Sequence, residues 1–560
     1  MGVWFVADKT FGIDEEVKEN GEVKGVKVAK EAWGVKEKEI YEVDINDVNQ
    51  EGQGIGRING FVVFVAGALL GEKVKAQITK LDKSYATAKI IKLLESSPDR
   101  VEPFCDVYKK CGGCGFQHMS YEAQLIWKKS IVENALKRIG GLGQWKGAQT
   151  IQVGQTNQVG QGETKVNDTI GMDIPFNYRN KAQFPVGYLS KTQEAGKLGT
   201  LSIEEAARTG ASGNTTEAIT AGFYSARSHD IVDIGVCGIH DDYANKVKDI
   251  VIEFLNEKRI TVYSEKTGKG LVRHIVTRTG TVTGEVMVVL VINGNEFPSM
   301  NELISRLCQE LPIIKSIVLN VNTRKTNVIF GDKNIIVYGD GYITDYIDKY
   351  KFKLSPLSFY QVNHTQAEVL YAKTLEYAGL TGTETVFDLY CGVGTISLYV
   401  SQQAKKVYGV EVVGSAIADA KANAKANGIN NVEFIEGKAE EVIPRLYKKG
   451  ITADVVIVDP PRKGCDQHLL DTILKMVPTR IIYVSCNPTT LARDLKYLCA
   501  NGKSKEAREE GPGVPEVGKV AGIGAGSKSP TYTIQEVQPV DMFPWTGHVE
   551  CVVLMSRVTS

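Results

Sequence analysis

Long apolar runs are missing from this sequence, and their absence excludes a membrane-spanning helix. No stretch approaches the roughly 18 consecutive apolar residues that such a helix needs. The first ten residues also lack a basic start followed by an apolar segment, so we expect no secretory signal. We therefore expect a cytoplasmic protein that does not bind membranes.

An overall excess of positive charge is missing too. The chain has 66 Lys and Arg against 66 Asp and Glu, so it has no whole-chain basic signature of a nucleic-acid-binding protein. Between Gly71 and Gly140, however, 13 basic residues stand against 8 acidic ones. This local excess fits a phosphate-facing surface, and equally a solvated surface of mixed charge.

A length of 560 residues predicts two to four domains. We expect a flexible leader over residues 1–38 and, because short β runs alternate there with Gly, Asn and Asp, an OB-like β-barrel over residues 39–96. A mixed α/β central domain is predicted over residues 97–350, with a helix at Tyr121–Arg138. Three Gly-rich tracts, at about residues 140–168, 192–220 and 504–530, look like surface insertions.

From residue 351 to 560 apolar strands alternate with helices, which is typical of a doubly wound α/β domain. The first strand runs into the Gly-rich turn C-G-V-G-T, and Glu411 ends the next strand, where a carboxylate can accept both hydroxyls of a ribose. The third glycine of the dinucleotide pattern is missing, because Ser397 stands there. The turn therefore favours S-adenosylmethionine over a dinucleotide.

Two further strands of this domain end in reactive side chains. One delivers Asp459 in D-P-P-R-K-G, and the other delivers Cys486 in S-C-N-P. A thiolate that adds to C6 of uracil makes C5 nucleophilic enough to take a methyl group, and a base must then remove the C5 proton. Glu550, at the start of the apolar run C-V-V-L-M, is a candidate base. Cys486 alone would also fit a buried core thiol, and Glu550 a solvated strand end.

Five motifs in order resemble those of the RNA uracil-5-methyltransferase family: S-F-Y-Q-V-N, D-L-Y-C-G-V-G-T, V-D-P-P-R-K-G, V-S-C-N-P-T-T-L-A-R-D and D-M-F-P-W-T-G-H-V-E. The resemblance covers about residues 40–560. It implies a Rossmann-like C-terminal domain and an N-terminal TRAM domain. It also implies that Cys486 is the nucleophile, that Glu550 is the general base, and that the cofactor site contains Gln361, Tyr390, Glu411 and Asp459.

The chain contains ten cysteines, which in a cytoplasmic protein are more often thiols, metal ligands or nucleophiles than disulfides. Cys105, Cys111 and Cys114 supply three soft ligands close together in the sequence, and a set of four thiolates suits a [4Fe-4S] cluster or zinc. The spacing C-x5-C-x2-C is not a common one for a zinc ribbon. The family resemblance adds Cys237 as a fourth ligand and favours a [4Fe-4S] cluster, as in members that act on ribosomal RNA. Asn180 and Lys181 match a family strand near the substrate.

Several other functions compete with this interpretation. A cytosine-5-methyltransferase would carry a cysteine directly after the Pro pair, where this chain has Arg462, and an amino-directed enzyme would favour an aromatic residue there. A non-catalytic RNA-binding protein would not need Cys486 and Glu550 beside an intact cofactor turn. We expect a monomer that methylates C5 of uracil in 23S ribosomal RNA, with transfer RNA as the alternative target.

Overall fold

The computed structural model describes residues 18–19, 22–23, 33–142, 165–189, 218–226, 228–500 and 532–558. Most of the predicted leader lies outside these residues. The third Gly-rich tract lies wholly outside them, and the first two lie mostly outside them. Two short paired strands, β1 (Lys18–Glu19) and β2 (Glu22–Val23), come first. No helix in the described part of the chain is long and apolar enough to cross a membrane.

The N-terminal sheet has the strand order β3-β7-β8-β6-β5-β4. Burial alternates along β5, β6 and β7, because successive side chains of a strand point to opposite faces. A Cβ on Gly56 in β5 would lie 2.2 Å from Val43 in β3, so these two strands cross closely and curl the sheet. The predicted OB-like barrel is confirmed. Its strands are β3 (Ile40–Asp44), β4 (Asp47–Val48), β5 (Gln53–Ile58), β6 (Phe61–Ala66), β7 (Lys73–Leu81) and β8 (Tyr85–Glu95).

The central sheet has the order β12-β11-β10-β13-β14-β15-β16, and only β14 and β15 pair in parallel. Every residue of β13 and β14 is buried, since two helices and the rest of the molecule cover their faces. The strands are β10 (Lys181–Tyr188), β11 (Ile219–Tyr224), β12 (Ile231–Asp233), β13 (Val272–Thr279), β14 (Val286–Ile292), β15 (Ile314–Val321) and β16 (Lys333–Gly339); the helices are α5 (Asp242–Glu257) and α6 (Met300–Glu310). The hairpin β17 (Ile343–Ile347) and β18 (Tyr350–Leu354) leads to the C-terminal domain.

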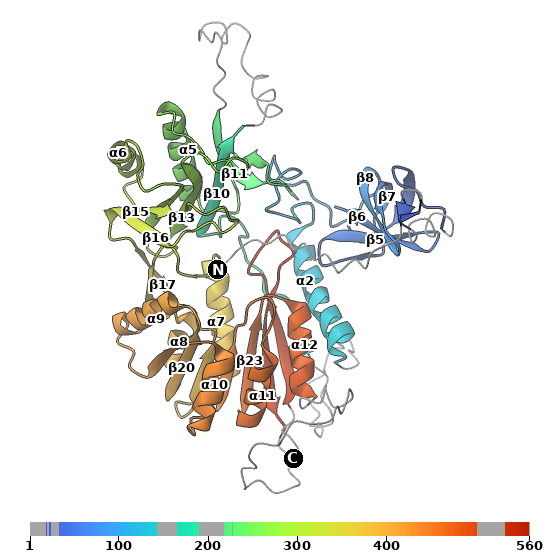
Figure 1. Cartoon of the computed structure of the whole chain (residues 1–560). Coiled ribbons are helices and arrows are strands. Elements are labelled where there is room, and N and C mark those ends of the chain that lie inside the picture. The colour runs from blue at the N-terminus through green and yellow to red at the C-terminus, as the bar shows by residue number, and fades with distance from the viewer. Residues whose placement is uncertain are drawn as a thin grey trace.

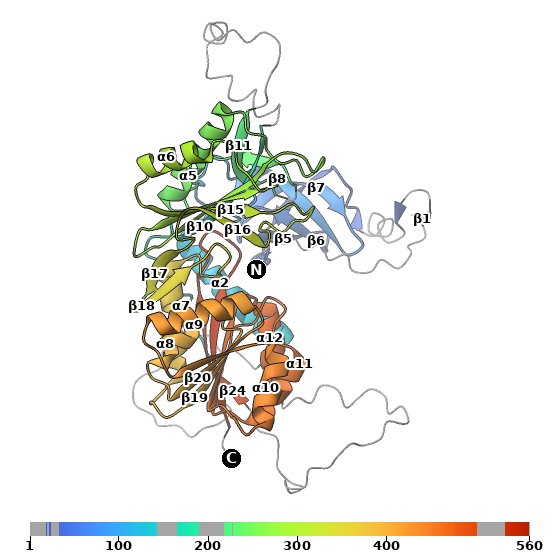
Figure 2. The same ribbon diagram turned by 60° about the vertical axis from the view of Figure 1, so that its left-hand side comes forward.

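The C-terminal sheet has the order β21-β20-β19-β22-β23-β25-β24-β9, with helices on both faces, as Figures 1 and 2 show. Strand order reverses between β19 and β22, and ligands of open α/β sheets bind at such a point. The predicted doubly wound domain is confirmed. Its strands are β19 (Thr385–Leu389), β20 (Lys406–Glu411), β21 (Val432–Glu436), β22 (Val455–Val458), β23 (Arg480–Ser485), β24 (Tyr532–Val540) and β25 (Glu550–Arg557). Its helices are α7 (His364–Ala378), α8 (Thr395–Ser401), α9 (Gly414–Ala426), α10 (Ala439–Lys448), α11 (Gln467–Met476) and α12 (Pro488–Cys499).

The segment after the barrel packs on the C-terminal sheet before the chain enters the central sheet. Helix α2 (Tyr121–Ala135), which continues as the π-helical turn η1 (Leu136–Gly140), lies beside α12 in Figure 1, and β9 (Lys165–Val166) pairs with β24. Lys128 and Asp541 form a fully buried ion pair between α2 and the loop before β25, with Nζ and Oδ1 2.5 Å apart. The helix predicted at Tyr121–Arg138 is therefore present and fixes that loop.

Candidate active site

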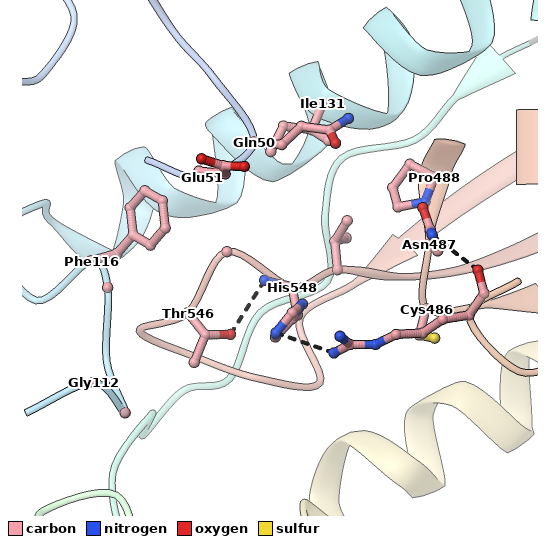
Figure 3. A pocket seen from close by; sticks show the side chains of 15 residues that line it. Gln50, Glu51, Gly112, Phe116, Ile131, Cys486, Asn487, Pro488, Thr546 and His548 are labelled. Carbon is pink, nitrogen blue, oxygen red and sulfur yellow. Dashed lines mark hydrogen bonds between the residues drawn. The ribbon is translucent and has the colours of Figure 1, made fainter. Parts of the chain in front are cut away.

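Cys486 lies between the end of β23 and the start of α12. The side chain of Asn487 accepts a hydrogen bond from the backbone N–H of Thr489 (3.0 Å) and caps the helix, while Pro488 occupies the first turn, where its missing N–H costs nothing. The S-C-N-P motif is therefore a strand end, a cap and a helix start. This geometry holds the Cys486 side chain half-buried, at the wall of a cavity of about 400 Å³ (Figure 3).

The D-P-P-R loop after β22 is tied to the same helix start. The backbone carbonyl of Arg462 accepts hydrogen bonds from Nδ2 of Asn487 (3.0 Å) and from the hydroxyl of Thr490 (3.1 Å). The carbonyl of Lys463 accepts one from the guanidinium of Arg493 (2.9 Å). Arg462 and Cys486 thus line one cavity on two loops that hydrogen bonds tie together.

Glu550 begins β25, next to β23, and its side chain is only 6% exposed. Burial, and next the nearby carboxylate of Asp459, raise the pKa of Glu550 to about 8, while Arg462 lowers it. Burial likewise raises the pKa of Asp459 to about 6. An acid whose pKa lies near neutrality is suited to accept and return a proton at working pH.

The same groups act on the thiol. Burial raises the pKa of Cys486 to about 12, with Glu550 and Asp459 adding to the effect and Arg462 opposing it. The sulfur, the two carboxyl groups and the guanidinium are therefore close enough to influence one another. A cation brought to this site would lower the thiol pKa and generate the thiolate.

Four parts of the chain surround the cavity. Gln50 and Glu51 come from the barrel, Phe116 from the cysteine-bearing segment and Ile131 from α2 (Figure 3). The remaining wall comes from the loops that carry Arg462, Cys486 and Thr546 to Val549. An elongated ligand that reaches Cys486 must therefore also lie against the barrel.

A second group of predicted residues gathers around the Gly-rich turn. Glu411 accepts hydrogen bonds from the backbone N–H of Gly392 (3.3 Å) and of Val413 (2.9 Å), which fixes its carboxylate at the end of β20. Asp388 is fully buried. Its Oδ2 accepts from the Ser397 hydroxyl (2.5 Å), and its Oδ1 has no hydrogen-bond partner among the described residues. Burial, with the charges of Asp459 and Glu411, raises the Asp388 pKa to about 7.

The structure places the other two predicted cofactor residues at this edge in different ways. Tyr390 follows β19 with a positive φ of 68°, so its backbone forms the turn, whereas its ring packs against the apolar layer that includes Cys465. Gln361 is buried just before α7, and its backbone carbonyl accepts a hydrogen bond from Nδ2 of Asn180 (3.1 Å). Lys181, next in β10, lies over the ring of Phe330.

The four predicted metal-binding cysteines come together in space. Burial raises the pKa of Cys114 to about 12 and that of Cys111 to about 11, and neighbouring thiolates, including Cys237 and Cys105, add to both effects. The backbone N–H of Gly113 donates to Sγ of Cys111 (3.4 Å). Within the described residues, however, no three or more His, Cys, Asp or Glu side chains are arranged closely enough to hold a metal ion.

Two residues of the candidate active site were not predicted from the sequence. Arg462 was used only to argue against other enzymes, yet it is the cation that faces both Cys486 and Glu550. His548, next to the guanidinium of Arg462 at 3.4 Å, lines the cavity as well. The sequence feature that could have indicated Arg462 is its position directly after the Asp-Pro-Pro at the end of a strand.

Family models match two parts of the chain. Residues 280–507 match the model described as tRNA (Uracil-5-)-methyltransferase, and residues 34–91 match the TRAM domain.

Relatives match almost the whole length. A protein from Caldanaerobacter subterraneus subsp. tengcongensis, described as an uncharacterized RNA methyltransferase, is 45% identical over 94% of this chain and 99% of its own. A protein of the same description from Halalkalibacterium halodurans is 44% identical over 94% of this chain and 99% of its own. Among solved structures, the Pyrococcus abyssi tRNA (uracil-54, C5)-methyltransferase in complex with S-adenosyl-L-homocysteine is similar, with a TM-score of 0.64. It is 27% identical over 92% of this chain and 99% of its own.

Proposed function

Because the chain belongs to the RNA uracil-5-methyltransferase family, a family of S-adenosylmethionine-dependent enzymes, we propose that it methylates C5 of a uracil in 23S ribosomal RNA through a covalent adduct with Cys486. The observation that carries this proposal is that Cys486 and Arg462 line one cavity and that both lie close enough to the buried carboxyl group of Glu550 to affect its charge or be affected by it, with Asp459 also nearby. A non-catalytic RNA-binding protein has no use for a nucleophile and a base in mutual electrostatic contact.

The cofactor site is proposed at the reversal point of the sheet. The glycines of the turn let a ligand approach the backbone, and Glu411, held by two backbone N–H groups, would accept hydrogen bonds from the ribose hydroxyls of the cofactor. The unpartnered Oδ1 of buried Asp388 is an acceptor at the same turn, and Tyr390, Gln361 and Asp459 complete the set. S-adenosylmethionine supplies an electrophilic methyl group on a sulfonium cation.

The covalent cycle uses two side chains. The thiolate of Cys486 forms a bond to C6 of uracil, and the electron pair of the C5–C6 double bond moves towards O4. C5 thereby becomes nucleophilic and takes the methyl group, and S-adenosylhomocysteine would leave with the electron pair of the broken sulfur–methyl bond. The Glu550 carboxylate then removes the C5 proton, the double bond re-forms and the C6–S bond breaks, which frees the thiolate. Since C5 and C6 are shielded in a base stack, the uracil must be flipped into the cavity.

Arg462 links these steps electrostatically. Its positive charge lowers the pKa values of Cys486 and Glu550, against the larger raising effect of burial. It therefore favours the charged form of each group, the thiolate for attack and the carboxylate for proton removal.

Trapping on RNA that contains 5-fluorouracil tests the mechanism, since fluorine cannot leave as a proton. We expect a stable protein–RNA adduct with the unaltered chain, none with Cys486→Ala, and accumulation of the adduct on normal RNA with Glu550→Gln. Cys499→Ala removes a half-buried thiol elsewhere in the domain and is the matched control. Normal methylation by Cys486→Ala would exclude the proposed nucleophile.

Ribosomal RNA is the proposed substrate because the resemblance associates the cysteine set with family members that act on it. Transfer RNA is the second candidate, supported by the similarity to the Pyrococcus abyssi enzyme. Mass mapping of both RNA classes from a strain that lacks the gene would separate them: loss of 5-methyluridine from transfer RNA alone would reverse the assignment.

A [4Fe-4S] cluster on Cys105, Cys111, Cys114 and Cys237 is part of the proposal. Mutual electrostatic effects among the thiols and the N–H bond to Cys111 Sγ support it, although the side chains are not yet arranged as ligands. Anaerobic reconstitution should give close to four irons and four sulfides per chain, and Cys111→Ala should lose them while Cys308→Ala does not. An equal iron content in both variants would exclude these cysteines as the ligands.

A further inference from the structure

His548 lies two residues before Glu550, on the loop before β25, and lines the same cavity as Cys486, here called the Cys486 cavity. Its imidazole faces the guanidinium of Arg462, with Nε2 3.4 Å from Nη2 (Figure 3). A guanidinium has five N–H donors and no acceptor, so Nε2 of His548 must be the acceptor. The ring is therefore neutral in this contact, with its proton on Nδ1.

The surroundings of His548 keep its imidazole neutral. Burial lowers its pKa to about 4, and the positive charges of Arg462, Lys128 and Arg179 add to this effect. A protonated ring would place a second cation against Arg462 and would have no lone pair left at Nε2 to accept from it. The hydrogen bond is therefore kept throughout the neutral pH range.

The position of the Arg462 side chain depends on this contact. The backbone carbonyl of Arg462 is fixed by Asn487 and Thr490. The residue is nevertheless exposed, and its guanidinium forms no other hydrogen bond or ion pair within the described part of the chain. A long side chain held at one point loses its orientation when that point is removed, because its rotatable bonds regain their freedom. His548 therefore keeps this cation at the wall of the Cys486 cavity.

The loop that carries His548 is itself fixed. The backbone N–H of His548 donates to Oγ1 of Thr546 (3.3 Å), and the Thr546 hydroxyl donates to the carbonyl of Phe543 (2.8 Å). The Phe543 ring stands edge-on to the imidazole, with 6.0 Å between the ring centres. Lys128 of α2 donates to the same carbonyl (3.1 Å), so the anchor of the imidazole extends to α2.

The imidazole is a poor candidate for a base in its own right. Its pKa is about 4, whereas that of the Cys486 thiol is about 12, so the ring would hold a negligible share of protons taken from the thiol. Arg462, in contrast, opposes the effect of burial on both Cys486 and Glu550. A contribution of His548 to the reaction must therefore pass through the guanidinium.

From these contacts we infer that His548 is a positioning residue: its neutral imidazole holds the Arg462 guanidinium in the Cys486 cavity, where this cation stabilises the thiolate. The inference rests on the proposed function for what the thiolate then does. It assigns to His548 a role in the charge state of the nucleophile and none in proton transfer or in RNA binding.

The direct test needs neither RNA nor S-adenosylmethionine. Iodoacetamide alkylates thiolates, and mass spectrometry of the peptide that contains Cys486 gives the alkylation rate of this residue alone. His548→Phe keeps a ring next to Phe543 and removes the acceptor. We expect Cys486 of this variant to be alkylated at pH 8 about tenfold more slowly than in the unaltered chain, because less of the thiol is ionised once the cation has moved away.

Two further variants separate positioning from packing. His548→Gln retains an acceptor, an amide oxygen that can reach the place of Nε2, and should restore most of the rate. His468→Phe is the matched control, because His468 is an exposed histidine on α11, and it should react as the unaltered chain does. Equal rates for His548→Phe and the unaltered chain, or no recovery in His548→Gln, would overturn the inference.

A double variant shows whether His548 acts through Arg462. Arg462 is exposed, so Arg462→Met should keep the fold, and it should slow alkylation of Cys486 about tenfold. His548→Phe added to it should cause little further change, because the cation that it positions is gone. Losses that add up in the double variant would mean that His548 acts on the thiol directly, which contradicts the inference.

A kinetic measurement then connects the contact to the reaction. On RNA that contains 5-fluorouracil, His548→Phe should form the adduct about tenfold more slowly at saturating RNA, with an unchanged RNA concentration for the half-maximal rate. A rise in that concentration with an unchanged maximal rate would show an RNA-binding role and refute positioning. If the unaltered chain forms no adduct with any such RNA, the proposed function fails, whereas the alkylation series still decides the role of His548.

Discussion

At the residue scale, Glu550 is the side chain whose charge state is most informative. It lies inside the domain, and burial raises its pKa to about 8, far above its ordinary value of 4.5. The folded protein therefore holds a proton on Glu550 that the unfolded chain gives up above about pH 4.5. The stability that this group contributes is fully present below its pKa in the unfolded chain. It is lost as the pH rises through its pKa in the folded protein.

We predict that Glu550→Gln removes this pH dependence. At pH 5 the variant and the unaltered chain should have similar free energies of unfolding, while at pH 8 the variant should be more stable by on the order of 2–4 kcal/mol. Urea denaturation at both pH values measures the difference. A variant that is less stable at pH 8 would show that Glu550 is ionised in the folded protein.

The sequence predicts those candidate site residues that directly follow apolar strands. Asp459, Cys486 and Glu411 each stand at or after the end of a parallel strand, and such ends meet at one edge of a sheet. The sequence does not predict the buried partner of Asp541. Lys128 lies in the middle of a helix, where a lysine is ordinarily exposed, and its partner is 413 positions away.

At the element scale, α2 holds the loop before β25 by the Lys128–Asp541 pair. Lys128 also donates to the carbonyl of Phe543 (3.1 Å), and Tyr121 donates to Asp541 (2.9 Å). We predict that Lys128→Met lowers the free energy of unfolding by about 3–5 kcal/mol, because it leaves a buried carboxylate without its cation. Lys129→Met, which removes only the surface pair with Asp168, should change it by less than about 1 kcal/mol. Chemical denaturation at pH 7 compares them, and equal effects would refute a special role for the buried pair.

The start of α12 combines stability and activity in one side chain. Asn487→Asp keeps the cap but loses the N–H donated to the Arg462 carbonyl, and its charge raises the pKa of Cys486 further. We predict an unchanged melting temperature and a kcat at least about tenfold lower. Asp466→Ala removes the cap of α11. It should lower the free energy of unfolding by about 1 kcal/mol and have little effect on kcat. A normal kcat for Asn487→Asp would mean that the D-P-P-R loop keeps its position without this bond.

At the scale of the whole molecule, the barrel docks on the catalytic half through close contacts. Gly52, with a φ of +74°, lies against the Phe116 ring, which a Cβ would approach to 2.4 Å. Arg100 also forms two hydrogen bonds to Glu72 (2.5 and 2.8 Å). The barrel residues Gln50 and Glu51 reach the Cys486 cavity only because this docking is tight.

We predict that Gly52→Ala shifts the barrel and raises KM for RNA severalfold, while the affinity for S-adenosylmethionine stays unchanged. Gly67→Ala is the control, since Gly67 has nearly the same φ, +72°, and nothing within 4 Å of the added Cβ. Both variants carry similar backbone strain of about 1 kcal/mol, but only the first has a clash. Equal KM values would show that barrel position does not affect RNA binding.

The order of the C-terminal sheet has a consequence for protein synthesis. Strand β25, which carries Glu550, lies between β23 and β24, although both precede it in the chain. A ribosome therefore produces the cofactor turn and Cys486 long before the carboxylate, and the growing polypeptide must leave a gap in its sheet for the strand still to come. The proposed base therefore joins the proposed nucleophile only when the last strand has been inserted and the sheet is complete.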